Sequence, residues 1–381
     1  MTIIPIVAGF LLGFLWFNDW VNYFPNLSMA IVTESLSLIE PKTTQSALSD
    51  IRSRVAIVFT GGTIAVTSDK KAGPIPALRG KEILERIPEL AAYLPNVEIE
   101  VFDFATLPGP HISPEMMLTL ADFVRAVSDH SDGVVITHGT DSMEESAYFL
   151  DVAIGDHVPV VFTGAMHHSL DVGWDGGRNL IDAVAVAASK EFIGEGVVVV
   201  MNGTIHSSTQ VTKSHTTRTD TFVSPDLGPL GRVNVLACEA PTKLRASNSH
   251  MAIPVDDEVE LPHVELLKTY AGMGDLFFRA AIDSGAKGIV VEAMGQGNVP
   301  PGVMNGIARA CEMKIPVVIT SRCFSGPVRP YYAYEGAGLE LERIGCIFAP
   351  YLTGPKARIK LMLALAAGYS SEKIQEIFAA L

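Results

Sequence analysis

Short runs rich in valine and isoleucine recur along this chain from about Val55 onward, and they limit its fold more than any other feature. The runs occupy residues 55–59, 133–137, 158–164, 196–203 and 288–295. Runs of this kind, without polar alternation, are typical of strands whose two faces are both covered. Stretches with helical character lie between them, at 114–128, 142–154 and 176–190. This alternation predicts an α/β fold with a parallel sheet.

The length of the chain indicates more than one domain. Its 381 residues exceed one ordinary domain and fit two. A polar, proline-punctuated segment without periodicity reads as a linker, and further β/α units follow it from Val264 to a terminal helix at 370–380. We predict four parts: an N-terminal extension (1–53), a larger α/β catalytic domain (54–239), a linker (240–262) and a smaller C-terminal α/β domain (263–381).

Composition excludes several classes of protein. With 48% apolar and 18% charged residues the chain is globular, and its net charge of -14 without any Lys/Arg-rich run excludes nucleic acid as a partner. The four cysteines show no CxxC spacing, so we expect free thiols in a reducing compartment and a cytoplasmic location. The cysteines are Cys238, Cys311, Cys323 and Cys346.

The first residues of the chain form an apolar run at 3–17. This run is shorter than the ~20 residues that a bilayer-spanning helix needs, and no Lys or Arg precedes it as in a secretory signal. We favour an artefact of start-codon choice, with Met29 as the true start, or a dispensable extension. A signal or anchor at 1–28, which would make the protein periplasmic or membrane-anchored, stays the alternative.

Two glycine loops each follow a predicted strand: FTGGTIA at 59–65 and THGTDSMEES at 137–146. In open α/β sheets ligands bind beyond the carboxyl ends of strands, and glycine there permits close backbone approach and exposes N–H donors. TGGT alone also fits a tight turn or a phosphate loop, although the nucleotide-binding glycine patterns are absent. In the second loop Asp141, or Ser142 with Glu145, fits a helix cap and a capping box. That reading leaves Gly139 and Thr140 unexplained.

A third candidate segment, at 211–231, is rich in hydroxyl groups around Lys213. The ordinary alternative is a solvated loop with an exposed lysine. A threonine hydroxyl is a weak nucleophile until a base takes its proton, and lysine can be that base only where the neutral amine is favoured. Spacing alone does not bring these groups together.

The motifs TGGTIA and HGTDSMEESAYFLD stand in order, followed by PVVFTGAM, VVVVMNGTIHSSTQVTKSHT and SPDLGPLG. From about Val55 to its C-terminus the chain resembles the bacterial-type L-asparaginases and glutaminase-asparaginases. The resemblance implies a two-domain α/β fold, no cofactor and no metal. It also implies a homo-oligomer, a dimer or tetramer, whose active sites use both subunits. The expected reaction is the first step of asparagine catabolism, the hydrolysis of L-asparagine to L-aspartate and ammonia.

The resemblance also assigns roles to residues. It makes Thr63 the nucleophile that forms an acyl-enzyme, with Thr140, Asp141 and Lys213 relaying the proton. Asp141 would bind the α-ammonium of the substrate. The loops of Gly62 and Gly139 would supply N–H donors to its α-carboxylate and to the oxyanion.

The chain departs from the family pattern at several positions. Gly109 and Pro110 stand where the family often has the serine, or Ser-Gln, that binds the α-carboxylate, with His111 and Ser113 as nearby substitutes. No tyrosine lies between Thr63 and Ala92, where periplasmic members have a catalytic one. We therefore expect Tyr334, beside the substrate-binding candidate Glu335, to complete the site. Gly272 stands at the place of a substrate-binding asparagine.

Two segments contain histidines that could have a chemical role. We expect His138 to stabilise its loop by hydrogen bonds rather than to act as a base. His167 and His168, with Asp171 and Asp175, match no zinc spacing, so no metal site is expected there.

Three alternatives to an asparaginase stay open. The first is a glutaminase-asparaginase. The second is the amidase subunit of a tRNA-dependent amidotransferase. The third is a catalytically weak amino-acid binding or sensor protein of the same fold.

Overall fold

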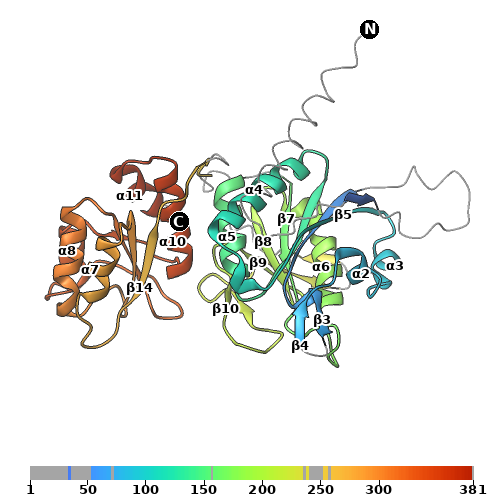
Figure 1. Ribbon diagram of the computed structural model, residues 1–381, viewed down its shortest axis with the longest axis horizontal. Helices are drawn as coiled ribbons and strands as arrows, with labels where there is room; N and C mark the ends of the chain where they lie inside the picture. Colours follow the sequence, from blue (N-terminus) through green and yellow to red (C-terminus); the bar gives the residue numbers. More distant parts are fainter. Residues whose placement is uncertain are drawn as a thin grey trace, which may run out of the picture.

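The computed structural model describes residues 33–35, 53–69, 73–155, 158–234, 237–239, 252–255 and 259–379. Two α/β units lie side by side, the larger built from the N-terminal part of the chain and the smaller from its C-terminal part (Figure 1). The predicted two-domain α/β fold is thus confirmed. Most of the predicted linker and of the extension lies outside the described residues, so the four domain boundaries stay a prediction.

The larger unit contains a nine-stranded sheet in the order β1-β5-β2-β6-β7-β8-β9-β12-β13. Its central strands β5, β2, β6, β7 and β8 are parallel. The strands are β1 (Thr33–Ser35), β2 (Ser53–Gly61), β5 (Val97–Leu107), β6 (Gly133–Thr137), β7 (Val160–Thr163), β8 (Val197–Met201), β9 (Thr204–Ser207), β12 (Gly231–Asn234) and β13 (Ala237–Glu239).

The sequence predicts a parallel sheet, but the large sheet is parallel only in its centre. Strands β9, β12 and β13 extend it on one edge by antiparallel pairing, and β1 pairs antiparallel with β5 on the other. These short edge strands lack the valine runs of the centre, which is why the pattern did not reveal them. Two further antiparallel pairs project from the unit: β3 (Val66–Asp69) with β4 (Gly73–Pro76), and β10 (Thr212–Lys213) with β11 (Phe222–Val223).

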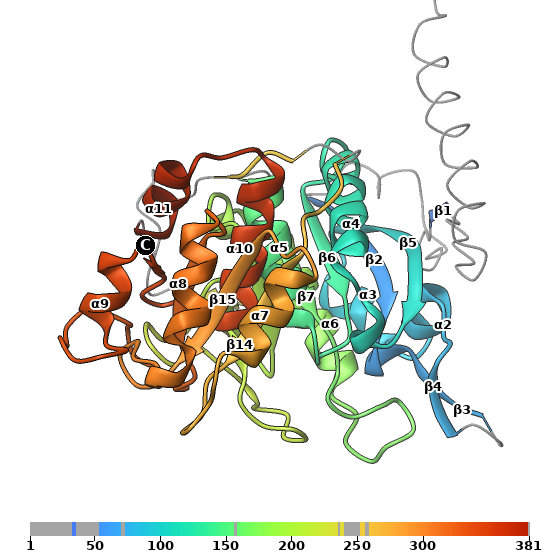
Figure 2. The same cartoon turned by 60° about the vertical axis from the view of Figure 1, so that its left-hand side comes forward.

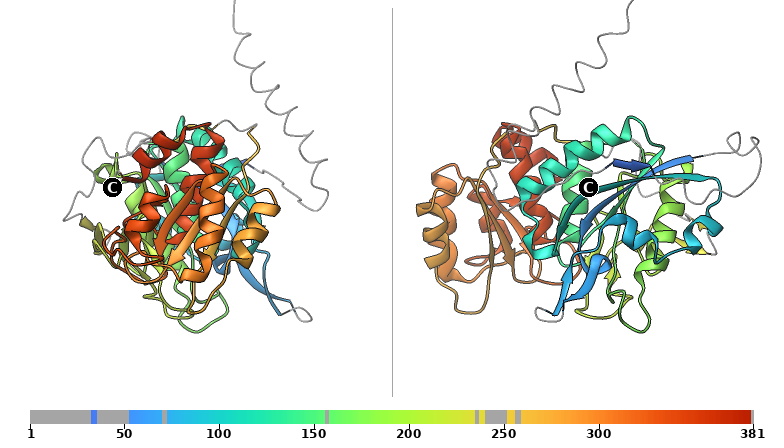
Figure 3. Two further views of the ribbon diagram at one scale, coloured as in Figure 1. Left: turned by 90° about the vertical axis from the view of Figure 1, so that its left-hand side faces the viewer. Right: turned by 45° about the vertical axis from the view of Figure 1, so that its right-hand side comes forward.

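Helices cover both faces of the large sheet, as the unbroken apolar runs predicted (Figure 3). Along β2, Ala56 and Val58 face one apolar cluster with α4 and α5, whereas Val55 and Ile57 face the other with α2, α3 and α6. All four side chains are fully buried. The helices are α2 (Gly80–Leu84), α3 (Glu89–Tyr93), α4 (Pro114–Ser128), α5 (Met143–Ile154) and α6 (Gly176–Ala187), with 3-10 turns η2 (Thr63–Ala65), η3 (Gly109–His111) and η4 (Lys190–Phe192).

The smaller unit is a four-stranded parallel sheet in the order β14-β15-β16-β17. Helices α7 and α8 pack on one face and α10 and α11 on the other. Its elements are β14 (Val264–Lys268), α7 (Leu276–Asp283), β15 (Gly288–Ala293), η5 (Pro301–Val303), α8 (Met304–Glu312), β16 (Val317–Ser321), α9 (Gly338–Arg343), β17 (Ile347–Phe348), α10 (Gly354–Ala366) and α11 (Ser371–Ala379).

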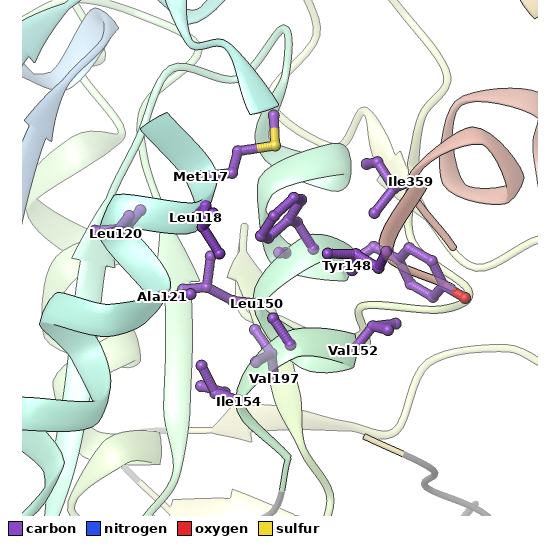
Figure 4. Close-up of a cluster of buried hydrophobic side chains, with 14 of the residues drawn as sticks. Met117, Leu118, Leu120, Ala121, Tyr148, Leu150, Val152, Ile154, Val197 and Ile359 are labelled. Atoms are coloured by element: carbon purple, nitrogen blue, oxygen red, sulfur yellow. The ribbon is translucent and has the colours of Figure 1, made fainter. Parts of the chain in front are cut away.

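Helix α10 joins the two units because it packs on its own sheet and on α5 of the larger unit (Figure 2). One apolar cluster therefore runs through both units. Figure 4 shows the contact region, where Ile359 of α10 lies beside Tyr148 of α5. Among the residues that the structure describes, no helix combines the length and apolar character needed to cross a membrane.

Candidate active site

Strand order makes the boundary between β2 and β6 a topological switch point. After β2 the chain continues to β5 on one side, and after β6 it continues to β7 on the other. Open α/β sheets bind ligands at such switch points, beyond the carboxyl ends of the strands. The TGGT loop follows β2 and the HGTD loop follows β6, so the fold itself brings the two predicted glycine loops together.

The backbones of three loops pass each other too closely for side chains. A Cβ atom on Gly62 would lie 2.5 Å from the Cα of Gly139, and one on Gly139 would lie 2.6 Å from the Cα of Gly109. Gly62 also has a φ of 77°, which favours glycine. The Thr60 hydroxyl donates to the Thr137 carbonyl at 2.8 Å and ties the first two loops. Gly109, predicted from the altered family position, is therefore part of the same cluster.

Each catalytic threonine candidate directly follows one of the touching glycines. Thr63 begins the 3-10 turn η2 and is half-buried, and Thr140 is 6% exposed. Within the described part of the chain, the Thr63 hydroxyl has no hydrogen-bond partner. That leaves its oxygen free to approach a bound molecule.

Lys213 joins the second threonine to the neighbouring aspartate. Its Nζ lies 2.9 Å from Thr140 Oγ1 and 2.7 Å from Asp141 Oδ1. The lysine side chain is 16% exposed, whereas that of Asp141 is 62% exposed and can face a ligand. The backbone N–H of Lys213 donates to Glu144 Oε2 at 2.8 Å, which fixes the position of the lysine relative to α5. The structure thus brings Thr140, Asp141 and Lys213 into one constellation.

The alternative interpretation of Ser142 and Glu145 as a capping box at the start of α5 is wrong. Ser142 is the N-cap residue, but its side chain makes no cap hydrogen bond. Its hydroxyl instead donates to the Gly109 carbonyl at 2.7 Å, joining the third loop to the site. Ser113, a candidate substitute for the carboxylate-binding serine, caps α4 by accepting from the Met116 N–H at 3.4 Å. His111 is exposed on η3.

A cavity of about 330 Å³ adjoins this constellation. Thr63 and Lys213 do not line it, so it borders the threonine–lysine cluster rather than enclosing it. Burial, and secondly the charge of Glu144, raise the pKa of the Glu145 carboxyl at its wall. The lining residues are Gly109, Pro110, Ile112, Pro114, Met117, Asp141, Ser142, Glu145, Arg358 and Ile359.

His138 has the structural role that the sequence predicted. The side chain is fully buried, and its Nδ1–H donates to the Gly139 carbonyl at 2.8 Å. Because a carbonyl only accepts, this bond fixes the proton on Nδ1. Burial lowers the pKa of the imidazole to about 4, so the ring is neutral at pH 7. A neutral, enclosed ring that hydrogen-bonds its own loop stabilises that loop.

The predicted tyrosine is not joined to the cluster within one chain. Tyr334 is 56% exposed and its ring lies 5.7 Å from that of Tyr332. No contact in the described residues links Tyr334 or the exposed Glu335 with Thr63 or Lys213. A hydrogen bond does join loops of the two units, because the Gly326 N–H donates to Asp226 Oδ1 at 2.7 Å.

The structure also explains the loop with two histidines. Asp175 accepts from the backbone N–H groups of Met166 and His167 and from the Asn179 side chain, so it shapes the turn. Among the described residues, no group of three His, Cys, Asp or Glu side chains could hold a metal ion.

Two residues near the cluster escaped the sequence reasoning. Glu144 is one of two neighbouring glutamates at a helix start, where no local pattern singles it out, yet it accepts the Lys213 N–H. Lys356 lies fully buried in α10 and donates to carbonyls near Lys213. The available signal was a lysine in the largely apolar stretch GPKARIKLMLALA, which periodicity alone does not connect to a site in another domain.

Comparison with known proteins agrees with this arrangement. The family model described as asparaginase, N-terminal, matches residues 54–244, and the glutaminase/asparaginase C-terminal domain matches residues 263–378. The chain is 36% identical to a probable L-asparaginase of Deinococcus radiodurans, covering 85% of this chain and 97% of that protein. It is 35% identical to L-asparaginase 2 of Escherichia coli, covering 85% and 92%.

A solved structure has the same fold. The crystal structure of a probable cytoplasmic L-asparaginase from Campylobacter jejuni superposes with a TM-score of 0.77 at 33% identity, covering 86% of this chain and all of that one. Both family models match in chain order, and the relatives extend over most of the sequence. This chain therefore belongs to the L-asparaginase family.

Proposed function

We propose that the cluster of Thr63, Thr140, Asp141 and Lys213 hydrolyses L-asparagine to L-aspartate and ammonia through an acyl-enzyme on Thr63. The observation that supports the proposal is the contact of Lys213 Nζ with both Thr140 Oγ1 and Asp141 Oδ1. It is accompanied by the close approach of the Gly62 and Gly139 backbones, the residues that directly precede the two threonines. The three relatives described above are all named L-asparaginases.

The substrate would be held by charge and by backbone donors. Asp141 supplies a largely exposed carboxylate for the α-ammonium group. The glycine loops expose N–H groups that can bind the α-carboxylate and the oxyanion. Gly109 and Pro110 line the adjoining cavity, and we assign them to the carboxylate end of the substrate.

The first chemical step forms an ester. Thr63 Oγ attacks the side-chain amide carbon, and the proton of Thr63 passes through Thr140 to Lys213, which accepts it as the neutral amine. The C–N bond then breaks, the relayed proton goes to the leaving nitrogen, and ammonia departs. A threonine hydroxyl needs such a base because it is a weak nucleophile when protonated.

The second step regenerates the enzyme. Water gives a proton to the Thr140–Lys213 pair and adds to the ester carbon. The bond between that carbon and Thr63 Oγ breaks, and the threonine oxygen takes the proton back. L-Aspartate leaves as the second product, so no oxidant or cofactor takes part in the balance.

Ammonia release tests the proposal directly. We expect purified protein to release ammonia from L-asparagine, with L-glutamine measured in parallel. Ammonia from glutamine at an equal or higher kcat/KM would make the chain a glutaminase-asparaginase or an amidase subunit. Binding of asparagine without ammonia release would contradict the proposal in favour of an amino-acid sensor.

The same assay on cell fractions tests location. We propose a cytoplasmic protein, because the similar C. jejuni protein is described as a probable cytoplasmic L-asparaginase. The free thiols of Cys311, Cys323 and Cys346 support a reducing compartment. Activity in a periplasmic or membrane fraction would contradict this placement.

We further propose a homo-oligomer in which Tyr334 and Glu335 complete the site of a second copy. Large apolar side chains lie exposed mainly on the smaller unit, and such groups mark interfaces. Those in the smaller unit are Tyr270, Leu276, Phe277, Met313, Phe324, Tyr331, Tyr332, Tyr334 and Leu339. Tyr334 is exposed, and no contact in the described residues joins it to the cluster of its own chain, which fits a role across an interface.

A single-atom change tests the tyrosine. We expect Tyr334→Phe to lower kcat by about ten- to a thousandfold, because a phenol near the nucleophile can pass or orient a proton. The same change at Tyr331 or Tyr332 should have far less effect. Equal, small effects at all three positions would leave the site without a tyrosine.

A mixing experiment tests whether Tyr334 acts across the interface. When Tyr334→Phe and Thr63→Ala subunits are assembled together, one site of each hybrid pair has both groups intact. We expect activity to rise well above that of either variant alone. Activity that stays at the sum of the two variants would place Tyr334 in the site of its own subunit or outside any site.

A further inference from the structure

Lys356 makes an unusual connection between the two units. It lies on α10 of the smaller unit and is fully buried. Its Nζ donates to the carbonyl of Thr209 at 3.1 Å and to the carbonyl of Val211. Both carbonyls belong to the larger unit, in the segment that leads directly into β10 and Lys213.

This segment is bound from the larger unit as well. The Ser207 carbonyl accepts the N–H groups of Gln210 and Val211 and closes a turn. On α5, Asp151 accepts the Ser208 hydroxyl at 2.6 Å, and Glu144 accepts the Lys213 N–H. The segment thus passes between α5 and α10, and the Lys356 ammonium binds its carbonyl side.

Burying an ammonium group is unfavourable, and replacing buried charges with well-packed apolar side chains is often neutral or stabilising. A contribution to folding stability is therefore a weak explanation for a buried lysine in the apolar contact between α10 and α5. Burial lowers the pKa of Lys356 to about 8, while the charges of Glu144, Asp151 and Glu145 on α5 oppose the shift. No described residue other than Thr209 and Val211 accepts a hydrogen bond from this ammonium.

We propose that Lys356 is a positioning residue for Lys213: by binding the carbonyls of Thr209 and Val211 it sets the path of the chain into β10. Docking of α10 on α5 would then determine where the Lys213 amine meets Thr140 and Asp141. The inference rests on the proposed catalytic role of Lys213. It makes the smaller unit necessary for the alignment of a proton relay that lies wholly in the larger one.

The chain contains a matched control one helical turn further on. Lys360 also lies on α10 and donates to a backbone carbonyl, that of Ile377, at 2.7 Å. Burial lowers its pKa to about 8 as well. Its partner belongs to α11 of the same unit, so Lys360 has no route to Lys213.

The test compares Lys356→Met with Lys360→Met, since methionine keeps an unbranched side chain and removes the amine. We expect Lys356→Met to lower kcat at least ~10-fold and to change KM by no more than about twofold. The reason is that the variant displaces Lys213, which relays the proton, and leaves the residues that bind the substrate in place. Amide hydrogen exchange at Lys213 should become faster, because its bond to Glu144 depends on the path of the segment. Lys360→Met should leave both readouts near wild type.

Other outcomes would overturn the proposal. Unchanged exchange at Lys213 in Lys356→Met would show that Lys356 does not position the segment. Equal changes in both variants would show a general loosening of α10. If Lys356→Met does not fold, Lys356→Leu and Lys360→Leu are compared with the same criteria, since leucine also removes the N–H donor. The exchange readout needs no activity, so a wild-type protein that releases no ammonia refutes the proposed function but not the positioning.

Discussion

Replacement of Thr63 by alanine should lower kcat by at least ~10³-fold and leave the fold intact. Without the hydroxyl no ester can form, so only slow attack by water on a bound amide remains. The side chain is half-buried and its hydroxyl has no partner in the described residues, so the stability change should stay within about 1 kcal/mol. Steady-state ammonia release and thermal unfolding measure the two effects separately.

Two further variants make the Thr63 test specific. Thr63→Ser keeps an oxygen in the same place and should retain measurable turnover with an ester intermediate detectable by mass spectrometry. Thr67→Ala, four residues on in β3, removes a comparable hydroxyl outside the cluster and should keep near-normal activity. If Thr63→Ala releases ammonia at a rate near wild type, the assignment of the nucleophile is wrong.

Replacement of Lys213 by methionine should have the second-largest effect, a loss of about 10²- to 10⁴-fold in kcat. The variant keeps the aliphatic stem and removes the amine that lies 2.9 Å from Thr140 Oγ1 and 2.7 Å from Asp141 Oδ1. Because the Asp141 carboxylate is 62% exposed, the lost ion pair should cost only ~0–1 kcal/mol of stability. Kinetics and melting temperature should therefore separate clearly.

The control for Lys213 is a lysine in an ion pair away from the site. Lys268 lies 3.2 Å from Glu292 at the end of β14 and is largely exposed. Lys268→Met should change neither turnover nor stability appreciably. Should Lys213→Met stay active but melt at a much lower temperature, the lysine is structural and the relay needs another base.

The elements that the pattern predicted are those with strong local signals. Strand 133–137 and helix 114–128 were predicted with the bounds that the structure has, because a buried Val run and a Ser-Pro helix start leave little choice. The eleven residues of β5 were missed, since VEIEVFDFATL alternates in polarity and its carboxyl end lies in the site. Short edge strands such as β9 acquire their conformation from pairing with a neighbour, which no local pattern encodes.

The same division holds within the site. By itself the sequence determined that Gly62 and Gly139 follow buried strands and precede threonines. Glycine is required at both positions because the two loops touch there and leave no room for a Cβ atom. It also determined the family, through long motifs in a set order. The roles of Tyr334 and Glu335 stay predictions, because both lie exposed and a single chain does not join them to the cluster.

Only the tertiary structure decided which polar groups meet. Ser142 binds the Gly109 carbonyl rather than its own helix end, and Lys356 reaches the segment before Lys213 from another domain. Both contacts join residues far apart in the chain. They depend on the strand order at the switch point and on the docking of α10 against α5. Periodicity reports which face of an element is apolar, but the partner of a buried polar atom is set by the elements that pack around it.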